Sequence, residues 1–286
     1  MTDFLILDVF TDAPFTGNPL AVIPDATGLS EDSLQRIARE FNFSESTFVY
    51  PPEDPAHTAR VRIFAPATEL PFAGHPTIGT AIALAAAGHG PDMVLELGVG
   101  PIPVSVRDGK AQFTTPVPLF RGVRPGIDEL AACLGLAPDD IQTATHAPQM
   151  AGVGLTFCMV ELVDMDALSR ITPDLSAFRK AADTYDDRPN FSVYCYVRAG
   201  DRISARMFAP TGGIPEDPAT GSAAAGLTAY LATLEGRDIA LTIIQGVEMG
   251  RRSMIETTAA LENGIVTATT VAGRARQVAK GVLTLS

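Results

Sequence analysis

The sequence is poor in the residues that mark several common protein classes. It has no tryptophan, four histidines and three cysteines, Cys133, Cys158 and Cys195, in 286 residues. The cysteines are odd in number and widely spaced, so the sequence predicts neither a disulfide framework nor a zinc site. Unpaired thiols are typical of the reducing cytoplasm, where we expect this protein to be located.

Basic clusters and membrane-spanning apolar runs are also absent. The chain has 21 Lys and Arg against 33 Asp and Glu, which gives a formal net charge of -12 at pH 7. An acidic surface without a basic patch disfavours nucleic acid and anionic membranes as partners. The uncharged stretch 70–91 contains prolines and glycines. It therefore predicts a buried helix, too short to cross a bilayer.

Motifs for common cofactors are missing as well. We find no glycine-rich dinucleotide loop, no Walker loop, no His-Glu-x-x-His sequence and no carboxylates at metal-binding spacing. We therefore expect no cofactor and no metal. The sequence is otherwise that of a globular protein, with 46% hydrophobic and 19% charged residues.

The second half of the chain repeats the first. Segments from the first half recur 142 to 148 residues later in the same order, and the pairs are 42–44 with 190–192, 62–66 with 206–210, 75–81 with 217–223, and 98–99 with 246–247. Colinear matches predict one α+β unit used twice. The prolines of 116–125 mark the boundary, so we expect an N-terminal lobe of residues 1–118 and a C-terminal lobe of 119–286.

Each half contains one helix that is apolar nearly all round. These segments, near 77–87 and 222–234, are rich in alanine, which predicts burial on every side. A strongly bent sheet wrapped around a central helix would bury them. The short connection between the halves predicts a fixed orientation with a ligand cleft between two pseudo-symmetric lobes.

The loops before these two helices are candidate sites for a small anion. Backbone N–H groups at a helix start favour a carboxylate, and small residues leave them uncovered. Helix capping alone would explain one such loop, but two copies favour a binding role. The candidates for substrate binding are Gly74, Thr77, Gly221 and Ser222.

His75 and Asp217 occupy equivalent positions in these two loops. Pseudo-symmetry would place them across the cleft from each other, so they are predicted to form a catalytic pair of titratable groups. A structural role for a histidine in such a loop is the alternative.

Glu45 is the strongest single catalytic candidate. It lies in a strand-like segment whose other polar residues are small, where burial would raise the pKa of the carboxyl toward the range of a general acid/base. An outward-facing strand residue is the alternative for an average glutamate. In the repeat, the position equivalent to Glu45 is occupied by Val193. One half alone therefore supplies the principal proton carrier.

Weaker candidates surround these residues. Ser44 precedes Glu45, and Asn18 lies in a Gly-Asn-Pro turn that would direct its amide toward a substrate, although turn formation alone explains it. Arg251 and Arg252 follow a predicted strand, where a contact with a substrate carboxylate and a surface salt bridge are both open.

Several of these segments together resemble the PhzF-like family, whose fold is shared with diaminopimelate epimerase and proline racemase. The matching segments, in chain order, are 8–22, 42–48, 70–80, 206–222 and 245–246. The resemblance implies an α+β fold of two lobes, each a barrel-like, mostly antiparallel sheet around a central helix. It also implies that the last strand returns to the N-terminal lobe and that the protein is a homodimer.

The resemblance further implies a reaction. Family members isomerise a cyclic dihydro-hydroxyanthranilate without metal or cofactor, and Glu45 matches the glutamate that moves the proton. His75, Asp217 and Ser222 match other site residues of the family. Racemases of this fold use one thiol from each half, and the two loops here contain no cysteine.

We therefore expect a cofactor-independent isomerase of a small cyclic carboxylic or amino acid, with Glu45 moving a proton between carbons. Its partner would be a small anionic, cyclic or amino-acid-like substrate. Two alternatives remain at this point: an epimerase or dehydratase of a hydroxylated amino acid, and a non-catalytic small-molecule binding protein of the same fold.

Overall fold

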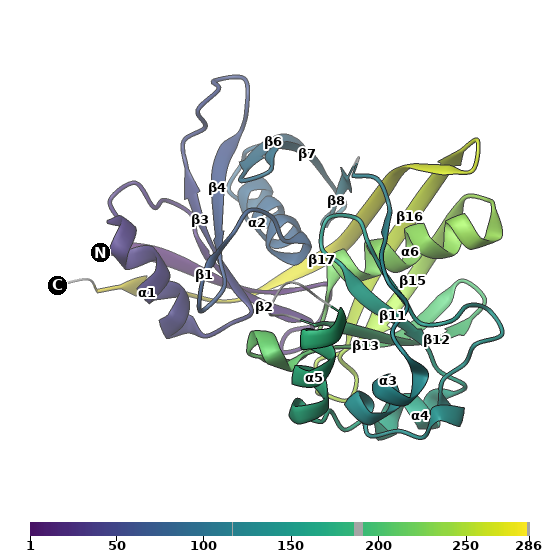
Figure 1. The fold of residues 1–286 in the computed structure, drawn as a ribbon. Coiled ribbons are helices and arrows are strands. Elements are labelled where there is room, and N and C mark those ends of the chain that lie inside the picture. Colours follow the sequence, from purple (N-terminus) through teal and green to yellow (C-terminus); the bar gives the residue numbers. More distant parts are fainter. Residues whose placement is uncertain (116, 186–190, 285–286) are drawn as a thin grey trace. The chain divides into compact units, whose positions relative to one another are not determined.

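The computed structural model describes residues 1–115, 117–185 and 191–284 (Figure 1). The chain divides into two compact units, one made of residues 1–115 with 270–286 and the other of residues 116–269. The end of the chain from Thr270 therefore belongs to the N-terminal unit. Asn190, the first residue of one repeat motif, lies outside the described residues.

A closed barrel of strands forms the N-terminal unit. Each strand pairs with the next in the ring and β8 pairs back with β17; the order is β17 (Ile265–Leu283), β1 (Thr2–Val9), β2 (Asn18–Ile23), β3 (Glu45–Tyr50), β4 (Ala59–Phe64), β6 (Asp92–Leu97), β7 (Gly100–Arg107) and β8 (Lys110–Thr115). The β2–β3 and β4–β6 pairs are parallel. The short strand β5 (Glu69–Leu70) adds to β4.

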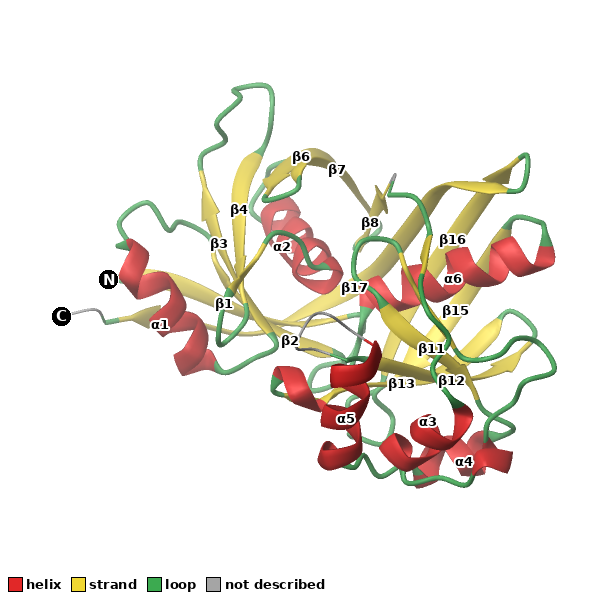
Figure 2. Cartoon of the chain, in the orientation of Figure 1, coloured by secondary structure: helices red, strands yellow, loops and turns green. Residues whose placement is uncertain are grey.

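Helix α2 (Gly74–Ala86) is packed against β1, β2, β3, β7 and β8 of this barrel (Figure 2). Its apolar residues are buried on all sides, as the sequence predicts. Gly79 allows the close approach: a Cβ atom there would lie 2.5 Å from a Leu20 methyl and 2.8 Å from a Val9 methyl. Helix α1 (Glu31–Phe41) buries only one face, through Leu34, Ile37 and Ala38, and covers β3 and β4.

The sheet of the C-terminal unit repeats this pairing order. Its strands are β9 (Phe120–Arg121), β10 (Gln149–Gly152), β11 (Phe157–Glu161), β12 (Val193–Ala199), β13 (Arg202–Ala209), β14 (Ile214–Asp217), β15 (Ile239–Gln245) and β16 (Ser253–Glu262). The β11–β12 and β13–β15 pairs are parallel, as β2–β3 and β4–β6 are in the first unit. Helix α6 (Gly221–Glu235) takes the place of α2, contacting β10, β11, β15 and β16. The predicted α+β fold with two related lobes is confirmed.

Additional helices cover the C-terminal sheet. They are α3 (Ile127–Leu134), α4 (Met165–Arg170) and α5 (Leu175–Tyr185), with the short 3-10 turns η1 (Pro138–Asp140) and η2 (Pro210–Gly212). Phe178, Phe191 and Phe208 lie in the apolar core of this layer. The three cysteines lie in the same core, so none of them is at the start of α2 or α6.

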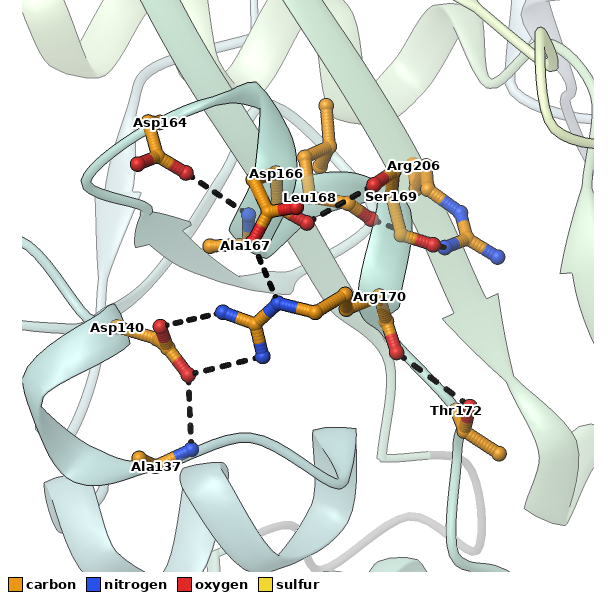
Figure 3. Close-up of polar contacts among 10 residues, drawn as sticks. All are labelled: Ala137, Asp140, Asp164, Asp166, Ala167, Leu168, Ser169, Arg170, Thr172 and Arg206. Atoms are coloured by element: carbon orange, nitrogen blue, oxygen red, sulfur yellow. Dashed lines mark hydrogen bonds and ion pairs between the residues drawn. The ribbon is translucent and has the colours of Figure 1, made fainter.

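Charged side chains fix α4 within this layer (Figure 3). Asp164 accepts a hydrogen bond from the Ala167 N–H at the start of the helix, at 2.8 Å. At its end, Arg170 pairs with Asp140 at 2.8 Å, and a buried guanidinium from β13, Arg206, donates to the Leu168 carbonyl at 3.0 Å. The Asp164 and Arg206 contacts satisfy backbone groups that a helix leaves unpaired at its ends.

Within the described part of the chain, the structure has no helix long and apolar enough to cross a membrane.

Candidate active site

The N-terminal unit contains the Glu45 part of the candidate site. Glu45 is the first residue of β3 and lies opposite Leu20 in the parallel β2–β3 pair. Its side chain is 14% exposed. Two residues further along the strand, Thr47 is fully buried and accepts a hydrogen bond from Thr80 of α2 at 2.9 Å, so this hydrogen bond joins the helix to β3.

His75 lies against Glu45. Its Nδ1 atom is 3.1 Å from Glu45 Oε2, and the imidazole is 4% exposed. Burial lowers the pKa of His75 to about 3, while a hydrogen bond with the Pro19 backbone opposes that shift. The ring is therefore neutral near pH 7.

The hydrogen bond with Pro19 also assigns the tautomer of His75. A proline has no N–H, so its backbone can only accept, and the imidazole nitrogen facing it must carry the hydrogen. His75 Nε2 is buried and has no hydrogen-bond partner among the described residues, whereas Nδ1 faces Glu45. The hydrogen therefore lies on Nδ1, which leaves Nε2 as a buried acceptor. Buried polar atoms of this kind are uncommon and often meet a ligand.

Two other predicted site residues of this half, Asn18 and Ser44, lie at the starts of β2 and β3. Asn18 opens β2 and is fully buried. Gly17 before it has φ +70°, and a Cβ atom there would lie 2.3 Å from the Val9 carbonyl oxygen, so the turn that places Asn18 requires glycine. Ser44 is partly buried just before β3.

The start of α2 differs from the sequence expectation. The helix begins at Gly74, so His75 and Thr77 lie in its first turn, not in the loop before it. Pro76 is compatible with this position because the φ of proline is helical and the first turn needs no N–H from it. The Thr77 hydroxyl donates to the Ala73 carbonyl at 2.8 Å and is fully buried.

The C-terminal unit contains the Asp217 part of the candidate site. Asp217 is the last residue of β14 and is 6% exposed. The Thr220 hydroxyl donates to Asp217 Oδ2 at 2.6 Å. Gly221 and Ser222 open α6, Gly221 buried and Ser222 partly so.

The structure thus brings Glu45, His75 and Pro19 together within one unit, and Asp217, Thr220 and the start of α6 within the other. That His75 and Asp217 face each other stays a prediction. Arg251 is partly buried and Arg252 is exposed in the turn after β15.

Some residues of the two half sites escaped the sequence reasoning. The Pro19 carbonyl has no side-chain signal at all. Gln245 and Thr220 did have one: Gln245 belongs to a recognised Gln-Gly motif, and Thr220 follows Asp217 at the three-residue spacing at which a hydroxyl reaches a carboxylate.

A separate cavity of about 640 Å³ lies on the N-terminal unit and contains none of the predicted site residues. Its charged lining residues pair with one another: His57 with Glu96 at 2.8 Å and Arg60 with Glu53 at 2.9 Å. The cavity is thus lined by residues that hold the β3–β4 loop in place. Among the described residues, no group of three His, Cys, Asp or Glu side chains could hold a metal ion.

Comparison with known proteins identifies the family. The model of the phenazine biosynthesis-like protein family (PhzC-PhzF) matches residues 7–281. The chain belongs to this family. It is 39% identical to a trans-2,3-dihydro-3-hydroxyanthranilate isomerase of Pseudomonas aeruginosa, over 98% of this chain and 99% of that protein. It is 38% identical to an uncharacterized isomerase of Mesorhizobium japonicum, over 98% of each chain.

Solved structures agree with this assignment. A PhzF-family phenazine biosynthesis protein of Bacillus anthracis superposes with a TM-score of 0.87 at 25% identity, covering 99% of each chain. A probable proline racemase of Agrobacterium radiobacter shares the fold, with a TM-score of 0.63 at 15% identity over 100% of this chain and 94% of that one. Because the relatives with 38% and 39% identity over nearly the whole chain are isomerases, this member of the phenazine biosynthesis-like family is an isomerase, as the sequence predicts.

Proposed function

We propose that the protein is a cofactor-independent isomerase of a small cyclic carboxylic or amino acid, in which Glu45 moves a proton between two carbons. The observation that carries the proposal is the partly buried Glu45 carboxyl group in contact with a buried, neutral His75. A dihydro-hydroxyanthranilate is the substrate class that the name of the Pseudomonas aeruginosa relative suggests.

The proposed reaction is balanced by one proton. The Glu45 carboxylate takes a proton from a ring carbon, and the electron pair of that C–H bond enters the conjugated system of the substrate. The carboxylic acid so formed can exchange its proton with water, and it then delivers one proton to a second conjugated carbon. A double bond moves, the carboxylate is regenerated and the composition of the substrate is unchanged.

Neutral His75 has a complementary role in this scheme. Its Nδ1–H holds the ring against the Pro19 carbonyl, and Nε2 can accept a hydrogen bond from a hydroxyl or ammonium group of the substrate. A charged imidazolium would instead stabilise the Glu45 carboxylate and weaken it as a base. Asp217 and Ser222, in the C-terminal unit, would orient the substrate.

The cysteines argue against the two-thiol racemase chemistry of this fold. Burial raises the pKa of Cys133 to about 12 and that of Cys158 and Cys195 as well. All three thiols are buried in the apolar core that the C-terminal sheet shares with its covering helices. An epimerase here would need another base.

The test is proton NMR of trans-2,3-dihydro-3-hydroxyanthranilate in deuterated water with wild type and Glu45→Gln. We expect Glu45→Gln to lower turnover by about 10²- to 10⁴-fold, the usual contribution of a general acid/base, and to remove deuterium incorporation at the ring carbon. Glu40→Gln, on the exposed face of α1, is the control that keeps turnover.

Two outcomes would contradict the proposal. Full turnover by a folded Glu45→Gln protein would show that another group moves the proton. Deuterium exchange at a stereocentre with no movement of a double bond would make the protein an epimerase.

A further inference from the structure

A chain of buried polar side chains stands behind Asp217 in the C-terminal unit. It joins the start of α6 to β12 and β15, and its members are Tyr194, Thr220, Gln245 and Asp217. Gln245 and Tyr194 are 0% exposed, and Thr220 is 8% exposed. Side chains buried to this degree must satisfy one another.

The Gln245 amide has only one possible orientation. Its Nε2 lies 2.7 Å from the Asp217 backbone carbonyl, which can only accept. Its Oε1 lies 3.2 Å from the Thr220 backbone N–H, which can only donate. Two backbone groups therefore decide which end of the amide is nitrogen, although oxygen and nitrogen look alike in shape.

This orientation determines the direction of the next bonds. The second Nε2 hydrogen points at Thr220 Oγ1, 3.0 Å away, so the hydroxyl oxygen is an acceptor there. Its own hydrogen is then directed to Asp217 Oδ2, at 2.6 Å. On the other side, Gln245 Oε1 accepts from the Tyr194 hydroxyl at 3.1 Å.

We propose that Thr220, with its hydroxyl hydrogen directed by Gln245, is a positioning residue for Asp217. The bond holds one oxygen of the carboxylate toward the protein and thereby sets the rotation of the group and its strength as a base. The use of Asp217 in catalysis rests on the proposed function. The hydrogen-bond order does not.

The Gln245–Thr220–Asp217 hydrogen-bond chain has no counterpart at the equivalent positions of the N-terminal half. The repeat aligns Gln245 with Leu97 and Thr220 with Ile78, neither of which can donate or accept through its side chain. The ionisable groups near Asp217 include Tyr194 on β12 and the Arg206–Glu216 pair on β13 and β14, with Glu248 3.9 Å from Arg206. The substitutions below leave these groups in place.

The experiment is a ¹³C NMR titration of the aspartate carboxyl carbons in the substrate-free protein, with the Asp217 signal identified by its loss in Asp217→Asn. Thr220→Val keeps the size of the side chain and removes the donor. We expect it to raise the pKa of Asp217 by about one to two units, the effect of losing one hydrogen bond to a carboxylate. Thr220→Ser keeps the donor, and its Asp217 should titrate within about 0.3 units of wild type on the same scale.

Gln245→Met tests the second link. It should raise the pKa of Asp217, as Thr220→Val does. The double variant should show no further shift, because both substitutions act through the same hydrogen bond, the one from Thr220 to Asp217. If Gln245→Met does not fold, Gln245→Glu keeps the shape and replaces the donor by a carboxylate, which would draw the Thr220 hydrogen to itself and free Asp217 from it.

Two results would overturn the inference. One is an unchanged titration of Asp217 in Thr220→Val; the other is an equal shift in Thr220→Ser, which would assign the effect to packing. With substrate, the pH profile of kcat/KM should shift in Thr220→Val and be restored in Thr220→Ser. The NMR titration needs no substrate, so it stands even if the proposed isomerase activity is absent.

Discussion

Each half has an arginine at the same repeat position that pairs with a glutamate, but the two pairs differ in burial. Arg62 on β4 and Arg206 on β13 occupy equivalent repeat positions, and each makes a bidentate pair with a glutamate at 2.7 to 2.8 Å, Glu69 or Glu216. Each guanidinium also lies over a phenylalanine ring of its own strand. The glutamates lie on the short strands that lead to His75 and to Asp217.

The difference is in burial and in the third partner. The Arg62 and Glu69 side chains are 15% and 44% exposed, and the remaining Arg62 nitrogen binds exposed Glu31. The Arg206 and Glu216 side chains are 7% and 16% exposed, and the remaining Arg206 nitrogen donates to backbone carbonyls at the end of α4. The repeated Arg–Glu pair, called the clamp below, is thus partly exposed in the N-terminal half (Arg62–Glu69) and buried in the C-terminal half (Arg206–Glu216).

The largest expected effect comes from removing each clamp. We expect Arg206→Met to lower the free energy of unfolding by about 3 kcal/mol or more, because it leaves Glu216 and several carbonyls without their partner. Arg62→Met should cost about 1 kcal/mol or less, as for exposed pairs. Urea unfolding of both variants measures the difference. Equal losses would mean that the two clamps are equivalent despite their burial.

A second contrast concerns equivalent positions before or at the start of the central helices, which carry the imidazole of His75 in one half and the carboxylate of Asp217 in the other. The imidazole makes stability depend on pH. Because the pKa of folded His75 is about 3 and that of an unfolded histidine about 6.5, only the unfolded chain takes up the proton between these values. Stability is therefore lost as the pH falls below about 6.5, at about 1.4 kcal/mol per unit until the pH reaches about 3.

The variant His75→Gln isolates this contribution. From pH 7.5 to pH 5, wild type should lose about 2 kcal/mol more unfolding free energy than His75→Gln. Urea unfolding at the two pH values gives the comparison. The same pH dependence in both proteins would mean that His75 is protonated in the folded state.

The smallest expected effect separates the two central helices. A Cβ atom at Gly79 of α2 would lie 2.5 and 2.8 Å from methyl groups, one of them on the rotationally stiff Val9. A Cβ atom at Gly226 of α6 would lie 3.0 Å from the Gly152 Cα and 3.1 Å from the flexible end of Met159.

Gly79→Ala should therefore destabilise by about 1 to 2 kcal/mol, since overpacking exceeds the gain in helix propensity. Gly226→Ala should change stability by less than about 1 kcal/mol, since the two effects nearly cancel there. Thermal unfolding of the two variants side by side checks this. The opposite ranking would show that α2 has more room to shift than α6.

Sequence patterns predicted what depends on composition and period. The two alanine-rich helices and the α+β unit used twice follow from apolar patterning and self-similarity, and the structure has both. The predicted start of α2, residue 77, was three residues too late, because a proline in the first turn of a helix and a proline before a helix look alike in sequence.

Side-chain partnerships between distant elements were beyond the sequence. Nothing in the motif around Gln245 shows that its amide would bond the Thr220 N–H, 25 residues away, and the Asp217 carbonyl. Leu97 at the equivalent position cannot do so, and α2 starts earlier relative to the repeat than α6. Gln245 thus bonds residues just before α6, whereas Leu97 has no polar side chain with which to do the same before α2.

Strand β17 has a consequence for the order in which the protein can fold. It closes the N-terminal barrel by pairing with β1, for example Thr2 with Leu283, although the entire C-terminal unit is translated between them. A ribosome-bound chain would expose the unsatisfied edges of β1 and β8 until β17 emerges. The first barrel to be started is thus the last to be finished, and its folding rate is tied to a loop closure across nearly the whole polypeptide.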